Sequence, residues 1–293
     1  MRISLRHEIT CRFDKPVSSI LRVLRITPWA IECQHLDTWR IDLNCDCRLR
    51  SGDDAFGNIV DTINADQPLE ALAITAQGEI VTTDTSGVLR NALERFPPDF
   101  YLRDTDITVA SESLREFADK AVSGKTDPLG RLHALLVAVC NEMEVASAGE
   151  TSPALDAIPT ASDAFRDEKG IARDIAHVFI AAARHIGAPA RFVSGALVPE
   201  KDPETTDASH SWAEAYAPGV GWIGFDPVQG LCTHEGHIRI AFALDHLGAS
   251  AMRSAPIFGV TEKTDSRLIA REARTIQSRQ ERSFGMRQEQ FQK

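Results

Sequence analysis

The alternation of apolar and polar residues predicts strands through the first third of the chain. Five stretches share this pattern: residues 3–13, 38–45, 59–63, 71–75 and 78–83. Such alternation is typical of strands that are buried on one face, and residues 53–58 look like the turn before the third of them. Strands at such short intervals predict a β-sandwich-like domain over residues 1–100.

Helical spacing of apolar residues begins after Pro97 and Pro98, which interrupt the strand pattern. Residues 111–121 and 128–143 both carry an apolar stripe of the kind that packs one face of a helix against a core. A shorter helix is expected at residues 161–165. The chain therefore changes from a strand-rich to a helix-containing domain near residue 100.

The clearest predicted helix covers residues 171–186. One face of it carries apolar residues at helical spacing: Ile175, Phe179, Ala182 and Ile186. Gly187 and Pro189 end it, because glycine suits a helix terminus and proline cannot continue a helix. The strands expected after it are residues 190–198, 209–216 and 221–226, the last two as a hairpin. These elements predict an α+β domain over residues 101–263.

Residues 264–293 are rich in Arg and Gln and depart from both domains. Their larger apolar residues are sparse, so we expect an exposed helix or a disordered arm rather than an element packed in a core. A basic tail on an acidic protein could also dock on the protein's own body or on a partner.

The charge balance excludes a large class of function. The chain has 293 residues, with 32 Lys and Arg against 42 Asp and Glu and a net charge of −10. A general nucleic-acid binder needs a concentrated Lys/Arg surface, so nucleic acid is not expected as a partner. No stretch approaches the ~20 apolar residues of a membrane span, so no membrane is expected either. The composition indicates a soluble globular protein.

The amino terminus and the cysteines favour a cytoplasmic location. Residues 1–12 contain two arginines near the start but no continuous apolar segment of the kind a secretory signal has. Six cysteines are scattered along the chain: Cys11, Cys33, Cys45, Cys47, Cys140 and Cys232. Such scatter is unlike a disulfide framework and agrees with a reducing compartment.

The predicted hairpin places a histidine near a carboxylate. Its turn is centred near Pro218 and Gly219, so residues equidistant from that turn lie opposite each other, and His210 comes close to Asp226. A carboxylate beside an imidazole fixes the tautomer of the ring and stabilises its protonated form, as in a catalytic triad. A nucleophile at the first turn of a helix would complete such a site, because the helix N-terminus lowers a thiol's pKa and offers N–H groups to an oxyanion.

The chain resembles the bacterial transglutaminase-like proteins of the papain-like cysteine peptidase superfamily. Residues 1 to about 90 look like the family's amino-terminal β domain, including the motifs at residues 25–28 and 54–58. Residues 128–240 look like its core, including the segment 188–195 and the segments around His210 and Asp226. The resemblance implies a β-sandwich-like domain followed by a transglutaminase-like, papain-like α+β core. It also implies attack on a carboxamide or peptide carbonyl through an acyl-enzyme.

The chain departs from this family at the nucleophile. Where the family has Gly-x-Cys-Gln-Asp-x-Ala-His, sometimes with Arg for Gln, residues 170–177 read Gly-Ile-Ala-Arg-Asp-Ile-Ala-His. The nucleophile position is therefore Ala172, and a methyl group can neither ionise nor form a thioester. The acyl transfer that the resemblance implies cannot proceed through this residue.

Two explanations of Ala172 lead to two functions. A pseudoenzyme would bind a peptide, amide or protein partner without turnover, and the unusual tail at residues 264–293 favours this hypothesis. The alternative is an active cysteine peptidase, amidase or acyltransferase of the same family, captured as a Cys→Ala mutant at position 172. A third, weaker hypothesis is a structural protein whose basic tail mediates assembly. The oligomeric state and the identity of the partner stay open.

Four further residues are candidates for the walls of a substrate cleft: Arg173, Asp174, Trp212 and Glu214. Arg173 would attract a carboxylate or phosphate if it projects into the cleft. Trp212 shares a strand face with His210 and could belong either to the cleft or to the core. Cys232 is the nearest cysteine in sequence after Asp226, but a packing role is the simpler interpretation.

No metal or organic cofactor is expected. Five residues could donate to zinc if they converged: His177, His210, Asp226, His234 and His237. His234 and His237 have i, i+3 spacing, which is not the i, i+4 pair of a zinc-binding helix, and the intervening Gly236 weakens any helix there. His177 is instead expected to pack behind the site.

Overall fold

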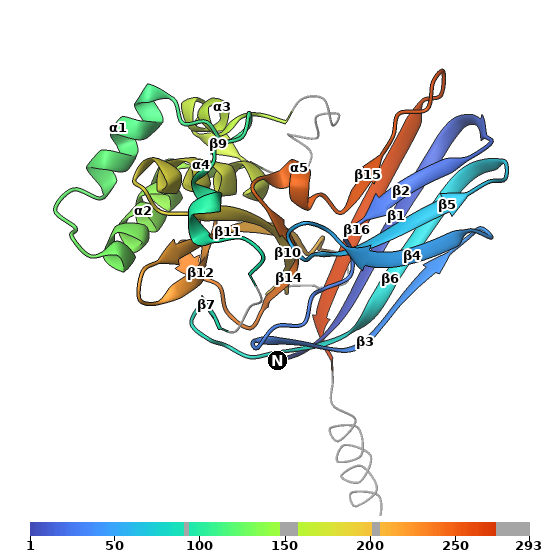
Figure 1. Ribbon diagram of the computed structural model, residues 1–293, viewed down its shortest axis with the longest axis horizontal. Coiled ribbons are helices and arrows are strands. Elements are labelled where there is room, and N and C mark those ends of the chain that lie inside the picture. The colour runs from blue at the N-terminus through green and yellow to red at the C-terminus, as the bar shows by residue number, and fades with distance from the viewer. Residues whose placement is uncertain (91–93, 147–157, 201–205, 274–293) are drawn as a thin grey trace, which may run out of the picture.

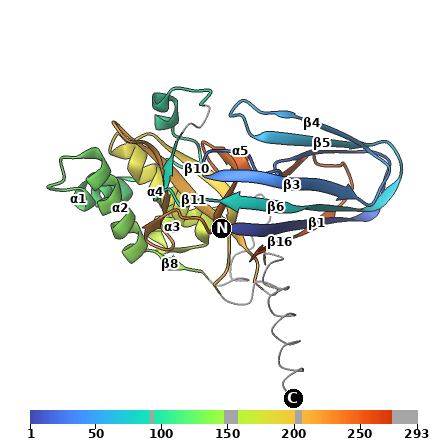
Figure 2. The ribbon, with the colours of Figure 1, turned by 90° about the horizontal axis from the view of Figure 1, so that it is seen from below.

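The computed structural model describes residues 1–90, 94–146, 158–200 and 206–273. The helices gather at one end of the molecule and a β-sandwich forms the other end, in both views of the ribbon (Figure 1, Figure 2). The predicted α+β class is therefore confirmed. None of the helices in the described ranges is long and apolar enough to cross a membrane.

Among the described residues, two antiparallel four-stranded sheets form the sandwich. The first has the order β16 (Glu262–Glu272), β1 (Arg2–Val17), β6 (Leu69–Thr82), β3 (Gln34–Leu43). The second has the order β15 (Met252–Ser254), β2 (Ile20–Leu24), β5 (Ile59–Ala65), β4 (Arg48–Asp53). Alternate residues such as Ile9, Leu24, Ile63 and Ile74 are buried between them. Burial of one face of each sheet explains why period-two alternation was visible in the sequence.

The two short strands expected at residues 71–75 and 78–83 are one continuous strand, β6. Gly78 lies in its middle, and a Cβ atom at that position would collide with the carbonyl oxygen of Thr38 on β3. Glycine is therefore required by a close approach of two backbones and does not mark a break between strands.

The expectation for the start of the tail was wrong. Residues 262–272 form β16, which pairs with β1 from Ile3 opposite Glu272 to Phe13 opposite Glu262. Leu268 and Ala270 are buried, while Lys263, Asp265, Arg267 and Arg271 lie on the opposite, exposed face of the strand. The few apolar residues suffice because an edge strand buries only one face. Residues 274–293 lie outside the described residues.

The helical end of the molecule is an α+β core whose predicted elements all lie within one residue of their expected bounds. Its helices are η1 (Pro98–Leu102, 3₁₀), α1 (Glu112–Ala121), α2 (Pro128–Glu142), α3 (Ala161–Arg166), α4 (Ala172–His185) and α5 (His246–Ala249). Its strands are β7 (Val88–Leu89), β8 (Glu144–Val145), β9 (Lys169–Gly170), β10 (Ala190–Leu197), β11 (Ser209–Ala217), β12 (Gly221–Asp226), β13 (Leu231–Cys232) and β14 (His237–Ala243). The main sheet has the order β13-β12-β11-β10-β14, with β7 also paired to β12.

Helix α4 lies at the centre of the core. It packs against β10 and β11 on one side and contacts α1, α2 and α3 on others, so every residue from Asp174 to Arg184 is buried. The Asp174 side chain accepts a hydrogen bond from the Ile171 N–H at 3.2 Å and so stabilises the helix start. Gly187 ends the helix with a positive φ of 82°. This packing fixes Ala172 at the first turn.

Side-chain amides of the sandwich cap the outer edge of the core sheet. Strand β14 is that edge. Asn58 donates to the Phe242 carbonyl at 2.7 Å and accepts from the Phe242 N–H at 2.9 Å. Gln34 makes the same pair of bonds with Arg239, both at 2.8 Å. Each amide therefore substitutes for a strand partner and joins the two domains.

We predict that Asn58→Ala lowers the free energy of unfolding by about 2 to 4 kcal/mol. The change leaves the buried N–H and C=O groups of Phe242 without partners, and each unpaired group costs roughly 1–3 kcal/mol. Chemical denaturation measures the loss, and Asn64→Ala on β5 is the matched control. A loss no larger than that of the control would contradict the capping role.

Candidate active site

The hairpin of β11 and β12 brings His210 and Asp226 together. Its register pairs Ala217 with Gly221 and Ala213 with Phe225, so the next pair along the strands is Trp212 opposite Asp226. His210 lies two residues further along β11. Its Nε2 atom is 2.7 Å from Oδ2 of Asp226. The structure thus contains the contact expected from the sequence.

Asp226 is fully buried and accepts four hydrogen bonds. Its Oδ1 accepts from the backbone N–H groups of Val228 and Gln229 at 3.0 and 3.2 Å, and its Oδ2 also contacts Nε2 of His237 at 3.1 Å. Burial by itself raises the pKa of this carboxyl, but the hydrogen bonds from His210 and His237 outweigh it, and the pKa is well below its usual value. Asp226 is therefore a carboxylate throughout the neutral range.

His237 was not expected to contact the carboxylate. The His234 N–H donates to Nδ1 of His237 at 3.2 Å, so the proton of the neutral ring is on Nε2 and points at Asp226. Burial lowers the pKa of His237, only partly opposed by Asp226, so the ring is neutral at pH 7. No sequence signal could have found this contact, because it joins the end of β12 to the start of β14 across a turn.

Three of the five possible metal ligands converge. Ligand atoms of His210, Asp226 and His237 all lie within 4.8 Å of one another, close enough for one ion. His234 contacts the ring of His237, and His177 is fully buried, where its Nε2 accepts from the His246 N–H at 3.1 Å. The hydrogen bonds of Asp226 with His210 and His237 already explain why these three side chains lie together, so we derive no metal chemistry from them.

Ala172 and His210 border one large cavity of about 1030 Å³. The cavity lies between the core and the sandwich, because residues of α4 and β11 line it together with residues of β1, β15 and β16. Arg173 also lines it, as expected of a cleft residue. Asp174, Trp212 and Glu214, the other three cleft candidates, are outside its lining.

None of the six cysteines, all of which lie in described ranges, lines this cavity. Cys232 Sγ is 3.5 Å from Nε2 of His133, and burial raises its thiol pKa. Cys140 Sγ is 3.9 Å from the Val228 carbonyl oxygen. Both positions agree with a packing role, and neither supplies a thiol to His210.

Two family models match the chain in the order of its two domains. The bacterial transglutaminase-like N-terminal region matches residues 3–81, and the transglutaminase-like superfamily matches residues 115–227. The chain belongs to the transglutaminase-like superfamily. The second match contains residue 172 as well as His210 and Asp226, so the family assignment covers the site whose geometry is described above.

Two individual proteins extend this likeness over most of the chain. An uncharacterized protein from Mycobacterium leprae (strain TN) is 24% identical over 266 residues, which are 86% of this chain and 92% of that protein. A Cytophaga hutchinsonii crystal structure, provisionally described as a cysteine protease, aligns with a TM-score of 0.72 at 18% identity. That alignment covers 94% of this chain and 91% of the other, so the two share a fold that includes both domains.

Glu214 and Trp212 belong to the interior of this transglutaminase-like core. For Glu214 this corrects the expectation that it walls the cleft, and for Trp212 it favours the core over the cleft. Glu214 is 1% exposed, 2.6 Å from Nε of Arg191 and 2.7 Å from Nε of Arg239. Burial raises the pKa of Glu214, but the two arginines outweigh it and lower the pKa overall. Trp212 packs with Phe242 and other aromatic residues on the same side of the sheet. The alternation of side chains along β11 correctly placed both residues on one face of the sheet, but at these positions other buried residues cover that face.

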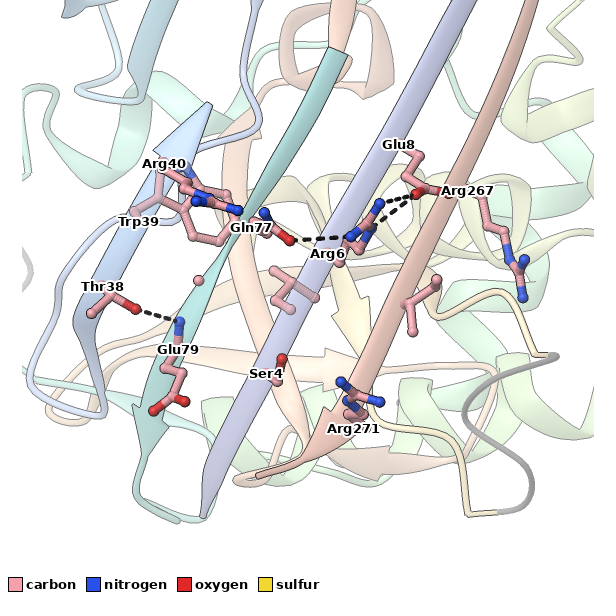
Figure 3. Close-up of a pocket in the computed structure, with 13 residues that line it drawn as sticks. Ser4, Arg6, Glu8, Thr38, Trp39, Arg40, Gln77, Glu79, Arg267 and Arg271 are labelled. Carbon is pink, nitrogen blue, oxygen red and sulfur yellow. Dashed lines mark hydrogen bonds and ion pairs between the residues drawn. The ribbon is translucent and has the colours of Figure 1, made fainter. Parts of the chain in front are cut away.

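A second cavity, of about 670 Å³, lies on the outer face of the sandwich, away from His210 (Figure 3). Side chains of β3, β1, β6 and β16 line it. Its central arginine, Arg6, is bonded to Glu8 at 2.6 Å and to Gln77 at 3.3 Å (Figure 3). The cavity beside Ala172 is the better candidate site, because the start of α4 and the His210 side chain held by Asp226 both border it.

We predict that Glu214→Gln lowers the free energy of unfolding at pH 7 by about 3–5 kcal/mol, because two buried guanidinium groups lose their shared carboxylate. The folded-state pKa of Glu214 lies below its unfolded value, so the difference between wild type and variant is full above about pH 4.3 and shrinks as the pH falls further. Denaturation at several pH values measures it. Exposed Glu116→Gln on α1 is the control, and equal losses in both variants would return Glu214 to the list of ligand-binding candidates.

Proposed function

We propose that this protein is a non-catalytic member of the transglutaminase-like superfamily that binds a peptide, amide or protein partner in its cleft without turnover. The observation that supports this most directly is that Ala172, Arg173 and His210 border one cavity while His210 keeps its bond to Asp226. An alanine side chain cannot form an acyl-enzyme, so the remaining groups can bind a substrate-like ligand but not complete the acyl transfer.

The remaining groups retain several means of binding. The N-terminus of α4 carries a partial positive charge and backbone N–H groups that favour a carbonyl oxygen or an anion. His210 is held through Nε2 by Asp226, which leaves its Nδ1 for another partner. These are polar groups fixed in place by buried neighbours, as a binding site requires.

A second candidate is an active cysteine peptidase, amidase or acyltransferase whose native chain has Cys at position 172. The intact contact of His210 with Asp226 favours it. So does β16, because a regular strand over residues 262–272 removes part of the departure from the family that the tail had suggested. The codon at position 172 of the native gene decides between the two candidates.

We predict that the Ala172→Cys variant has a thiol that iodoacetamide alkylates faster at pH 6 than an ordinary exposed thiol. A helix N-terminus and a nearby imidazole both lower a thiol's pKa, and each pKa unit gives about a tenfold gain in thiolate below that pKa. Val137→Cys, on an exposed face in the middle of α2, is the control. Mass spectrometry of the alkylated peptides gives the rates. Adding His210→Ala to Ala172→Cys is expected to remove most of the gain, and equal rates in both cysteine variants would show that residue 172 does not face an activating environment.

We predict that the chain with Ala172 releases neither ammonia nor amine from a panel of glutamine-containing peptides and peptide anilides, while binding a subset of them. Amine release by the Ala172→Cys variant that disappears with His210→Ala would show an intact site disabled at one position. If the thiol of the Ala172→Cys variant is reactive but no ammonia or amine is released, the groups of the cleft that position a substrate have changed as well. His210-dependent turnover by the unmodified chain would contradict the proposal.

A further inference from the structure

Four side chains that line the cleft have a buried nitrogen atom without a hydrogen-bond partner. Nine buried side-chain polar atoms in the described ranges have no hydrogen-bond partner, and four of them belong to cleft-lining residues: Nη1 of Arg25, Nη2 of Arg173 and Nδ1 of His7 and His246. His7 is only 5% exposed. These four atoms have almost no accessible surface, so a ligand in the cavity would meet other atoms of the same side chains.

The two arginines are held from behind by carboxylates. Nε of Arg173 is 2.8 Å from Oδ1 of Asp174, which is buried, and Nε of Arg25 is 2.8 Å from Oδ2 of Asp54. Asp54 is itself fixed by Nδ2 of Asn58 at 2.9 Å. A guanidinium held at Nε keeps its orientation and can offer Nη atoms to a planar acceptor such as a carboxylate.

The charges of the lining favour an anion. Glu262 is the one acidic residue among the described residues that line the cleft, and its Oε2 is 2.8 Å from Nη2 of Arg22. Burial lowers the pKa of both His7 and His246 to about 4, so these rings are neutral at pH 7 and serve as hydrogen-bonding groups. The fixed positive charges facing the cavity are Arg173 and Arg25, which come from different domains.

Among the described residues, β16 has no strand partner on the side away from β1, along the same cleft. The Ala273 N–H bonds to Arg2 on β1, whereas Leu268 bonds outward, its N–H to Asp207 at 3.1 Å and its carbonyl to Ala208 at 2.7 Å. Because backbone groups alternate in direction along an antiparallel strand, Thr264 and Ser266 also direct their N–H and C=O groups away from β1. Both residues are exposed and line the cleft. A free strand edge is the surface to which an extended peptide adds as a further strand.

We infer that the cleft binds an extended peptide along the outer edge of β16, with a carboxylate of that peptide held by Arg173 and Arg25. This inference rests on the proposed non-catalytic binding function and specifies its ligand. The volume of about 1030 Å³ accommodates several residues, and apolar lining residues such as Ile9, Ile240 and Val260 provide contacts for their side chains.

The first experiment varies only the charge of the peptide. An array of random hexapeptides ending in glutamic acid is compared with the same sequences ending in glutamine amide, both probed with the full chain. Dissociation constants of the strongest sequences are then measured by fluorescence anisotropy. At least tenfold tighter binding of the acid forms is expected. Equal binding of the two forms would overturn the carboxylate contact while leaving non-catalytic peptide binding in place.

Protein variants locate the contact. Arg173→Gln and Arg25→Gln are each expected to weaken binding of the acid peptides at least tenfold and to leave the amide peptides unchanged. Arg115→Gln, an exposed arginine on α1, is the matched control. Because the two cleft arginines also pair with Asp174 and Asp54, thermal unfolding of each variant is recorded, and the acid-to-amide ratio is compared rather than the affinity alone. An unchanged ratio in both variants would overturn the assignment.

A backbone change tests the strand edge without touching a charge. Ser266→Pro removes an N–H that faces away from β1, so the β1–β16 ladder loses no backbone hydrogen bond. It also removes the Ser266 hydroxyl, which is 2.9 Å from Nε2 of His7, so Ser266→Ala is the matched control for that side-chain contact. With Ser266→Pro, binding of the acid peptides is expected to fall at least tenfold with little change in the midpoint of unfolding. Full binding by this variant, or displacement of the peptide by acetate or inorganic phosphate at the peptide's own concentration, would overturn strand addition. Turnover of the peptides by the unmodified chain would instead contradict the proposed function.

Discussion

A single buried carboxylate organises the candidate site. Asp226 accepts hydrogen bonds from two histidines and two backbone N–H groups, and the bonds it accepts keep it ionised despite complete burial. Its charge fixes the ring of His210, and through His237 it also connects the hairpin to the strand at the domain boundary. This arrangement is independent of the side chain at residue 172, because no bond to Asp226 involves Ala172. The proposed binding function therefore does not require a nucleophile at this position.

Local sequence patterns predicted the elements that have a regular periodicity or clear end signals. Strand β1 alternates between buried and polar positions, Gly187 and Pro189 mark the end of α4, and β11 and β12 flank a turn at Pro218 and Gly219. Their bounds agreed with the structure to within one residue, except that β1 continues to Val17. Strand β14 was missed because all of its residues are buried, which erases the alternation that marks a half-buried strand. Strand β16 was mistaken for part of an arm because its exposed face is densely charged and its few apolar residues looked insufficient.

The candidate site was predictable only as far as it is local. The contact of His210 with Asp226 follows from a hairpin of two adjacent strands, and Ala172 follows from a helix start that resembles the family's motif. Glu214 was misassigned because its partners, Arg191 and Arg239, come from strands on either side in sequence, and parity alone does not reveal what covers a face. The contributions of Arg25 and of β16 to the cleft depend on how two domains meet, which no local pattern records.

The pairing of β1 with β16 has a consequence for how the chain reaches this structure. Strand β1 pairs with residues that are some 250 positions later in the chain, since Ile9 lies opposite Ser266 and Cys11 opposite Thr264. Closing so long a loop costs entropy that only later contacts repay, and it raises the contact order of the whole protein. During synthesis on a ribosome, the amino-terminal sheet must stay incomplete until the entire core has emerged. The cavity that borders Ala172 and His210 needs β16 for one wall, so it is among the last features of the molecule to form.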